Sequence, residues 1–211
     1  NCDVETAFAF EHCGAEVERL HLFRLLEQPQ RLRDFQILCI PGGFSYGDDV
    51  GAGVIFGSQL RGHLADVLRD FLQADKLLLG ICNGFQVLMR SGILPGGSAD
   101  WHPPEGRVPD ATLTWNDNGK FTARWVHLVT AGSSSPFLRG IDALDLPIAH
   151  AEGKVVVRDP KVLETLRERR QIAFCYSAAA GLAERGSVAR PDLQTLSAAE
   201  NPNGSEANIA G

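Results

Sequence analysis

Long apolar runs and positive charge are both scarce in this sequence of 211 residues. No stretch approaches the roughly 18 to 20 apolar residues that span a bilayer, and the N-terminus lacks the basic-then-apolar pattern of a secretion signal. The net charge of -6 argues against a nucleic-acid groove or a polybasic membrane patch, because both need concentrated positive charge. We therefore expect a cytoplasmic protein whose partners are small molecules or other proteins.

Paired metal ligands and paired cysteines are also lacking. The cysteines are odd in number, widely spaced and free of any CxxC motif, which disfavours a disulfide framework and a zinc site. Asp48 and Asp49 are adjacent carboxylates, but they have no third ligand in register, and helix capping explains them as well. We expect no metal in this chain, and one reactive cysteine among several inert ones. The five cysteines are Cys2, Cys13, Cys39, Cys82 and Cys175.

Strand and helix patterns alternate in the first half of the chain. Continuous apolar runs predict buried strands, and apolar residues at helical spacing predict helices. Such alternation is typical of a doubly wound parallel sheet, whose site lies at the carboxyl ends of its strands. The expected strands are 36–40 and 76–81, the expected helices are 3–13, 60–72 and 83–91, and 17–22 is an expected strand followed by a polar connection over 25–32.

The second half of the chain is richer in strands. Alternating patterns there predict antiparallel or mixed strands and one charged helix. Residues 177–200 are rich in Ala, Ser, Gly and Arg, so we expect a flexible surface loop and one domain over 1–211. The expected strands are 111–115, 121–129, 147–150, 155–157 and 171–176, the helix is 163–169, and 201–205 is a tight turn.

Cys82 stands in the segment Gly80-Ile81-Cys82-Asn83-Gly84, between an expected strand and an expected helix. This is the arrangement of a nucleophile elbow, in which small flanking residues allow a sharp, strained turn. The N-terminus of the following helix favours thiolate, and the Asn83 amide would face the oxyanion formed on attack. A buried structural cysteine is the alternative, and it fits Cys39 and Cys175 better.

A second loop, Pro41-Gly42-Gly43-Phe44-Ser45-Tyr46-Gly47-Asp48, follows the neighbouring strand. Backbone amides of Gly43 and Phe44 could donate to the same oxyanion. A phosphate-binding glycine loop is the alternative, but the spacing matches neither dinucleotide nor mononucleotide patterns. An α/β-hydrolase acting on an ester or lactone through a cysteine also remains open at this point, because the elbow is shared.

Four motifs in this order, PGGFSYGD, GICNGFQ, PIAHAEG and NPNGS, resemble the glutaminase subunit or domain of phosphoribosylformylglycinamidine synthase. The resemblance covers nearly the whole chain. It implies the class I glutamine amidotransferase fold, a flavodoxin-like α/β sandwich with a mostly parallel central sheet and a smaller mixed or antiparallel sheet. It also implies hydrolysis of L-glutamine to glutamate and ammonia, for ATP-dependent amidation of formylglycinamide ribonucleotide in purine biosynthesis.

The resemblance also assigns site residues. Cys82 is the nucleophile, Gly43 and Asn83 form the oxyanion hole, and Gln86 and Phe44 contact the substrate. The ammonia passes to a synthetase subunit or domain, which is joined in some arrangements by a small bridging subunit. The resemblance places ATP and Mg2+ in that synthetase, so we expect no cofactor in this chain.

The general base is not found by matching motifs. The family places a histidine and its orienting glutamate in a Pro-His-Pro-Glu segment beyond NPNGS, and a β-strand before the position of Asn1. We therefore expect the sequence to lack both segments. A module that keeps the fold without turnover is the alternative function, because general acid-base assistance contributes about a hundred- to ten-thousandfold.

His127 and His150 are the histidines that could replace the base. His150 and Glu152 are two residues apart, which on one strand would point both side chains to the same face and not toward each other. A plain strand histidine, or a place in the synthetase interface or near the ammonia exit, explains His150 better. The residues assigned to such an interface or exit are His150, Glu152, Asn203 and Ser205.

Overall fold

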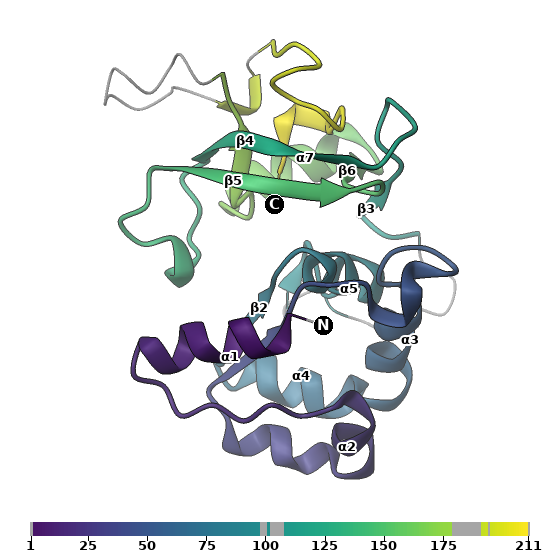
Figure 1. The fold of residues 1–211 in the computed structure, drawn as a ribbon, viewed down its shortest axis with the longest axis vertical. Coiled ribbons are helices and arrows are strands. Elements are labelled where there is room, and N and C mark those ends of the chain that lie inside the picture. The colour runs from purple at the N-terminus through teal and green to yellow at the C-terminus, as the bar shows by residue number, and fades with distance from the viewer. Residues whose placement is uncertain (1, 98–100, 102–107, 179–190, 194, 211) are drawn as a thin grey trace. The chain divides into compact units, whose positions relative to one another are not determined.

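The computed structural model describes residues 2–97, 101, 108–178, 191–193 and 195–210. The chain folds into two units, residues 1–107 and 108–211, which we call the N-terminal unit and the C-terminal unit and describe separately (Figure 1). Across the described parts of the chain, no helix is both long and apolar enough to cross a membrane.

The N-terminal unit is built on a pair of parallel strands, β1 (Ile37–Ile40) and β2 (Leu77–Gly80). Both follow from the short apolar runs of the sequence, which suit strands that are covered by helices. Ile40 pairs with Gly80 at the end of the ladder. The loops that follow the two strands therefore leave the sheet from the same edge.

Helices surround this pair of strands. Leu60, Leu64, Leu68 and Phe71 are buried with Val87 in one apolar cluster, which confirms the predicted stripe. The stripe is carried by two helices, because the backbone breaks at Leu64 (φ -111°, ψ 4°). In order, the helical segments are α1 (Asp3–His12), α2 (Leu22–Glu27), η1 (Pro29–Asp34), η2 (Ser45–Asp48), α3 (Val54–His63), α4 (Ala65–Gln73) and α5 (Asn83–Ser91).

One predicted strand is wrong. Residues 17–21 have no regular structure, and Leu22 begins α2. A strand needs a neighbour to satisfy its backbone N–H and C=O groups, and none of the described residues pairs with this segment. His21 instead caps α2, where its Nδ1 accepts a hydrogen bond from the Phe23 amide (3.3 Å). The predicted polar connection 25–32 is helical for most of its length.

The C-terminal unit consists mainly of antiparallel strands, as predicted. Strand β4 is central to a three-stranded sheet of order β5-β4-β7, and β3 pairs with β6. The elements are β3 (Ala111–Thr114), β4 (Thr122–Thr130), η3 (Pro136–Leu138), β5 (Ala143–His150), β6 (Lys154–Val157), α7 (Pro160–Glu168), β7 (Phe174–Tyr176), η5 (Pro191–Leu193) and η6 (Glu206–Asn208). The chain is thus a mixed α/β protein with short sheets.

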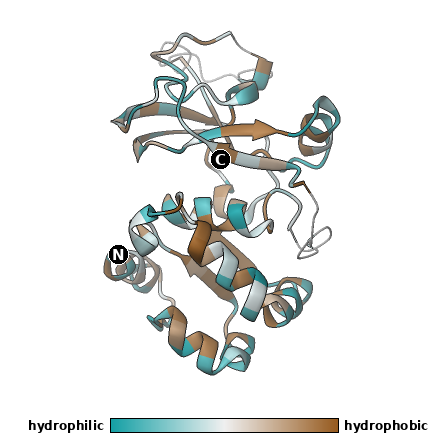
Figure 2. Cartoon of the chain, turned by 90° about the vertical axis from the view of Figure 1, so that its right-hand side faces the viewer, coloured by the Kyte–Doolittle hydropathy of each residue, from teal (hydrophilic) through white to brown (hydrophobic). Residues whose placement is uncertain are grey.

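Local signals explain the ends of these elements. Asp159 caps α7, since its carboxylate accepts hydrogen bonds from the Lys161 and Val162 amides (2.9 and 3.2 Å). Within the N-terminal unit, Figure 2 shows helices that alternate between hydrophobic and hydrophilic residues, as expected for helices with one buried face.

The predicted loop over 177–200 lies largely outside the described residues, and the single domain over 1–211 stays a prediction. Of the residues of this predicted loop that the structure describes, Ser177 is buried. Asp192, in η5, is also buried and forms an ion pair with Arg167 of α7.

Two glycines allow α5 to pack directly on the strands. A Cβ atom on Gly84 would overlap the carbonyl oxygen of Ile40, and one on Gly80 would lie 2.7 Å from Leu88 Cδ1 and 2.8 Å from the Gly84 carbonyl. These positions admit no side chain unless the helix moves away. The N-terminus of α5 is therefore held against the ends of both β1 and β2.

Substitution of Gly84 by alanine should destabilise the protein by about 3 kcal/mol, because the added methyl group is forced into a backbone carbonyl. Gly62→Ala is the matched control. Gly62 is exposed in α3 with no atom within 4 Å of its missing side chain, so alanine should stabilise the helix by about 0.5 kcal/mol. Urea unfolding measures both changes. Equal midpoints for the two variants would contradict the close packing described here.

Candidate active site

Cys82 forms the turn between β2 and α5. Its backbone has φ 52° and ψ -109°, a conformation that non-glycine residues adopt at an expense of about 1 to 3 kcal/mol. The turn is closed by hydrogen bonds from the Gly84 amide to the Ile81 carbonyl (2.8 Å) and from the Gln86 amide to the Cys82 carbonyl (3.1 Å). The cysteine is exposed. This is the geometry predicted for a nucleophile elbow.

The loop that follows β1 lies against this turn. A Cβ atom on Gly42 would be 3.3 Å from the Cβ of Cys82 and 3.5 Å from the carbonyl oxygen of Ile81. Gly43 comes next and has φ 124°, which favours glycine. Of the two predicted oxyanion donors, Asn83 directly follows the nucleophile and Gly43 directly follows Gly42, the glycine that approaches it. Their donation to an oxyanion stays a prediction.

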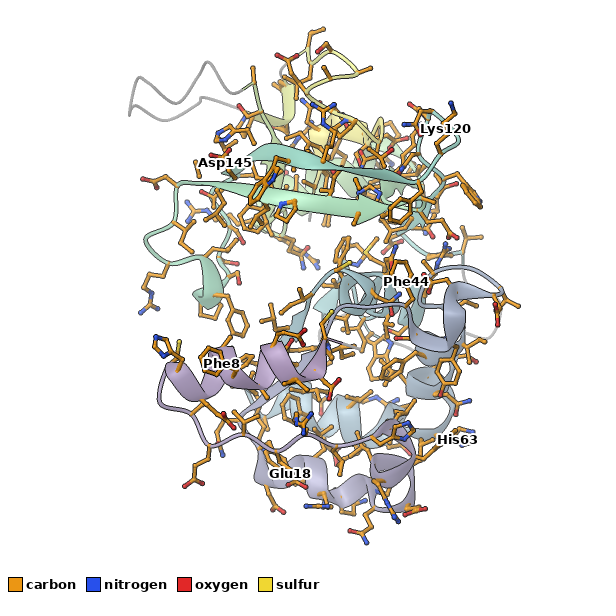
Figure 3. The ribbon with its side chains drawn as sticks, in the orientation of Figure 1. Phe8, Glu18, Phe44, His63, Lys120 and Asp145 are labelled. Atoms are coloured by element: carbon orange, nitrogen blue, oxygen red, sulfur yellow. The ribbon has the colours of Figure 1, made fainter. Side chains whose placement is uncertain are left out.

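Phe44, labelled in Figure 3, is 55% exposed. It precedes η2, where Tyr46, Gly47 and Asp48 all have positive φ values of 53° to 67°. Tyr46 and Asp48 are strained in this conformation, which glycine adopts without a steric penalty. The loop that carries the predicted donors thus needs support from outside itself.

The side chain of Asn83 provides that support. It is fully buried, although Cys82 beside it is exposed. Its Oδ1 accepts hydrogen bonds from the amide (3.0 Å) and the hydroxyl (2.5 Å) of Ser45, and its Nδ2 donates to Asp48 Oδ1 (3.2 Å). This role of Asn83 and Ser45 was not predicted, because it depends on a contact between residues far apart in the sequence.

Two sequence interpretations change here. Helix capping was one explanation predicted for Asp48, but α3 is preceded by Gly53 without a side-chain cap, and Asp48 accepts a hydrogen bond from Asn83. Gln86 is buried, and its Oε1 accepts a hydrogen bond from Asn83 Nδ2 (3.0 Å). Contact of Gln86 or Phe44 with a substrate stays a prediction.

Within the described residues, no three His, Cys, Asp or Glu side chains gather as a metal site.

His150 ends β5 in the C-terminal unit. Its Nδ1 lies 3.1 Å from Asn116 Oδ1, which also accepts from the Gly153 amide, so Nδ1 is the donor in this pair. Burial lowers the pKa of His150, which favours a neutral ring at pH 7. The strand stops at His150 and Glu152 lies in a bend. The expectation that the two share one strand is therefore wrong.

Asn203 and Ser205 are buried in the turn after residue 200. Asn203 Nδ2 donates to the Gly153 carbonyl (2.7 Å) and to the Tyr176 hydroxyl (2.9 Å), while Ser205 Oγ accepts from the Val155 amide (2.9 Å). These bonds attach the turn to β6 and β7. The role of His150, Glu152, Asn203 and Ser205 at an interface or an ammonia exit stays a prediction.

Within the described residues of the N-terminal unit, no histidine hydrogen-bonds to the Cys82 sulfur, and His21 caps α2. His127 is buried in β4, and its Nδ1 lies 2.7 Å from Asp145 Oδ1. Its Nε2 is buried and has no partner among the described residues. His127 is thus a strand histidine of the C-terminal unit that is oriented by a carboxylate.

Comparison with known proteins agrees with this geometry. A model of the CobB/CobQ-like glutamine amidotransferase domain matches residues 1–211. Phosphoribosylformylglycinamidine synthase subunit PurQ of Dehalococcoides mccartyi is 45% identical over 167 residues, which are 79% of this chain and 62% of that protein. The subunit of Methanococcus maripaludis is 37% identical over 211 residues, which are 100% of this chain and 72% of that protein.

A similar fold is also found among solved structures. A chain in the structure of PurLQS from Thermotoga maritima aligns with a TM-score of 0.59 and 24% sequence identity, covering 99% of this chain and 74% of that chain. The chain thus spans a little under two thirds to about three quarters of the length of these three relatives.

The cysteines should differ sharply in reactivity. Burial raises the pKa of Cys39 to about 11 and that of Cys175 to about 12, so at pH 8 about one Cys39 thiol in a thousand is ionised, and fewer at Cys175. A short treatment with iodoacetamide should therefore modify the exposed Cys2, Cys13 and Cys82 and spare the other two. Mass spectrometry measures the modification, and a denatured sample, in which all five react, is the control. Equal labelling of Cys175 in the folded protein would contradict its burial.

Proposed function

This chain belongs to the CobB/CobQ-like glutamine amidotransferase family and, within it, to the PurQ subunits of phosphoribosylformylglycinamidine synthase, and we propose that it releases ammonia from L-glutamine. The observation that carries the proposal is the strained, exposed Cys82 at the N-terminus of α5 with the Gly42-Gly43 loop beside it. The finer fold we propose is a flavodoxin-like sandwich, in which β1 and β2 belong to a mostly parallel central sheet.

In the proposed mechanism the Cys82 thiolate attacks the side-chain amide carbon of glutamine. The bond between sulfur and carbon forms, and the carbonyl oxygen becomes an oxyanion that the amides of Gly43 and Asn83 stabilise. The carbon–nitrogen bond then breaks, and ammonia leaves after its nitrogen has taken a proton. Water hydrolyses the thioester to glutamate and restores the thiol.

Protonation of the leaving nitrogen requires a general acid. Family resemblance assigns this role to a histidine oriented by a glutamate, and no such pair lies at Cys82 among the described residues of the N-terminal unit. This observation favours, as the second candidate function, a module that keeps the fold without turnover. Release of ammonia by the natural protein separates the two.

We further propose that the ammonia is used by a synthetase. The solved relative is titled a structure of PurLQS, so the corresponding partners of this chain are counterparts of PurL and PurS. In that arrangement the synthetase binds ATP and Mg2+ and amidates formylglycinamide ribonucleotide, while a small subunit bridges the two.

Replacement of Cys82 by serine should lower glutamine hydrolysis by at least about a thousandfold, because the hydroxyl is a far weaker nucleophile than the thiolate. Cys13→Ser, which changes another exposed cysteine, is the matched control and should keep full activity. Release of ammonia and labelling by a diazo-ketone analogue of glutamine are the measurements. A wild-type protein that binds glutamine without turnover would support the second candidate, and one that the diazo-ketone modifies elsewhere than Cys82 would contradict the proposed mechanism.

A further inference from the structure

The two segments that carry the predicted oxyanion donors are joined by one side chain. Asn83 is the first residue of α5 and directly follows the nucleophile, whereas Ser45 directly follows Gly43 and Phe44. The carboxamide of Asn83 reaches across to Ser45 and Asp48, which are the first and last residues of η2. It therefore holds the loop at both ends.

The hydrogen-bonding capacity of this carboxamide is fully used. A primary amide offers two acceptor lone pairs and two donor hydrogens. Asn83 Oδ1 accepts from the amide and the hydroxyl of Ser45, and Nδ2 donates to Asp48 Oδ1 and Gln86 Oε1. All four groups point to polar partners in a fully buried position. An asparagine in this environment has one orientation and cannot exchange its partners for water.

The segments on both sides of this contact are strained. Cys82 has a positive φ in the turn, and Tyr46 and Asp48 have positive φ values in the loop. Strained segments keep their geometry only when surrounding contacts enforce it. Asn83 belongs to the turn of Cys82, and its side chain hydrogen-bonds Ser45 and Asp48 in the loop, so it fixes the loop of Gly43 relative to that turn.

We infer that the side chain of Asn83 is a positioning residue: by hydrogen-bonding Ser45 and Asp48 it sets the separation between the two oxyanion donors. This inference rests on the proposed function and deepens it. It assigns to one residue two separate tasks, because the Asn83 backbone amide faces the reacting carbonyl while its side chain faces the interior. Misplacement of a catalytic group by about 1 Å lowers the rate about a hundredfold, so the expected effect is on turnover.

The test is Asn83→Asp in the full natural chain. This change keeps the size and the acceptor for Ser45, but it replaces the donor Nδ2 by an oxygen that faces Asp48 Oδ1. We expect the loop to be pushed away and kcat for glutamine hydrolysis to fall about 10- to 100-fold, with KM within about threefold. Asn118→Asp is the matched control. Asn118 lies in an exposed turn of the C-terminal unit, and this variant should keep the kcat of the wild type.

A second variant restores the hydrogen bond between the side chains of residues 83 and 48, with donor and acceptor exchanged. In Asn83→Asp combined with Asp48→Asn, residue 48 supplies a donor to the acceptor at residue 83. We expect kcat to rise at least fivefold above that of Asn83→Asp alone. Iodoacetamide, whose reaction with Cys82 forms no oxyanion, should modify wild type and both variants at rates within about threefold. A merely structural role would change the rate of reaction with iodoacetamide by more than threefold when kcat falls.

The outcomes are separable. A wild type without glutaminase activity overturns the proposed function. An active wild type with an Asn83→Asp variant of unchanged kcat, or a double variant no better than the single one, overturns this inference alone. Should Asn83→Asp not fold, Ser45→Ala decides the matter. It removes only the hydroxyl donor and should lower kcat about 3- to 10-fold with little change in KM; an unchanged kcat overturns the inference.

Discussion

The contact between Gly84 and the Ile40 carbonyl is the constraint on which the site depends. Parallel pairing of β1 and β2 already brings the two strand ends to one edge. The absence of a side chain at Gly84 then lets α5 approach that edge directly, which leaves Cys82 only a sharp turn. A larger residue at position 84 would move α5 away from the strand ends, and the turn at Cys82 would then be less sharp. Packing of α5 against the strands in the interior thus produces the sharp turn that carries the exposed Cys82.

The sequence predicted those elements whose signals are local. Apolar runs marked β1 and β2, and a helical stripe ending at Gly92 marked α5, which ends at Ser91 with Gly92 in the left-handed conformation. The strand predicted over 17–22 was wrong. Its residue pattern is compatible with a strand, but a strand also requires a hydrogen-bonded neighbouring strand, and the residues of the segment itself do not show whether one is present. The break at Leu64 was missed because the apolar stripe continues through it.

The site was predicted in the same uneven way. Gly-x-Cys-x-Gly is a local signal for a turn, so Cys82 was found directly from its neighbours. Asn83 was also singled out, but for its backbone amide. The task of its side chain depends on Ser45 and Asp48, which are 38 and 35 residues away along the chain. Only the pairing of β1 with β2 brings these residues together, and no periodicity in the sequence reports that contact.

Asn83 also affects how the neighbouring loop moves. The Ser45 amide lies in a glycine-rich segment near the surface, where backbone N–H groups usually exchange with solvent deuterium quickly. Here that amide donates to a fully buried carboxamide, so it exchanges only when this bond to Asn83 opens. Slow exchange would set the Ser45 amide apart from those of an ordinary surface loop.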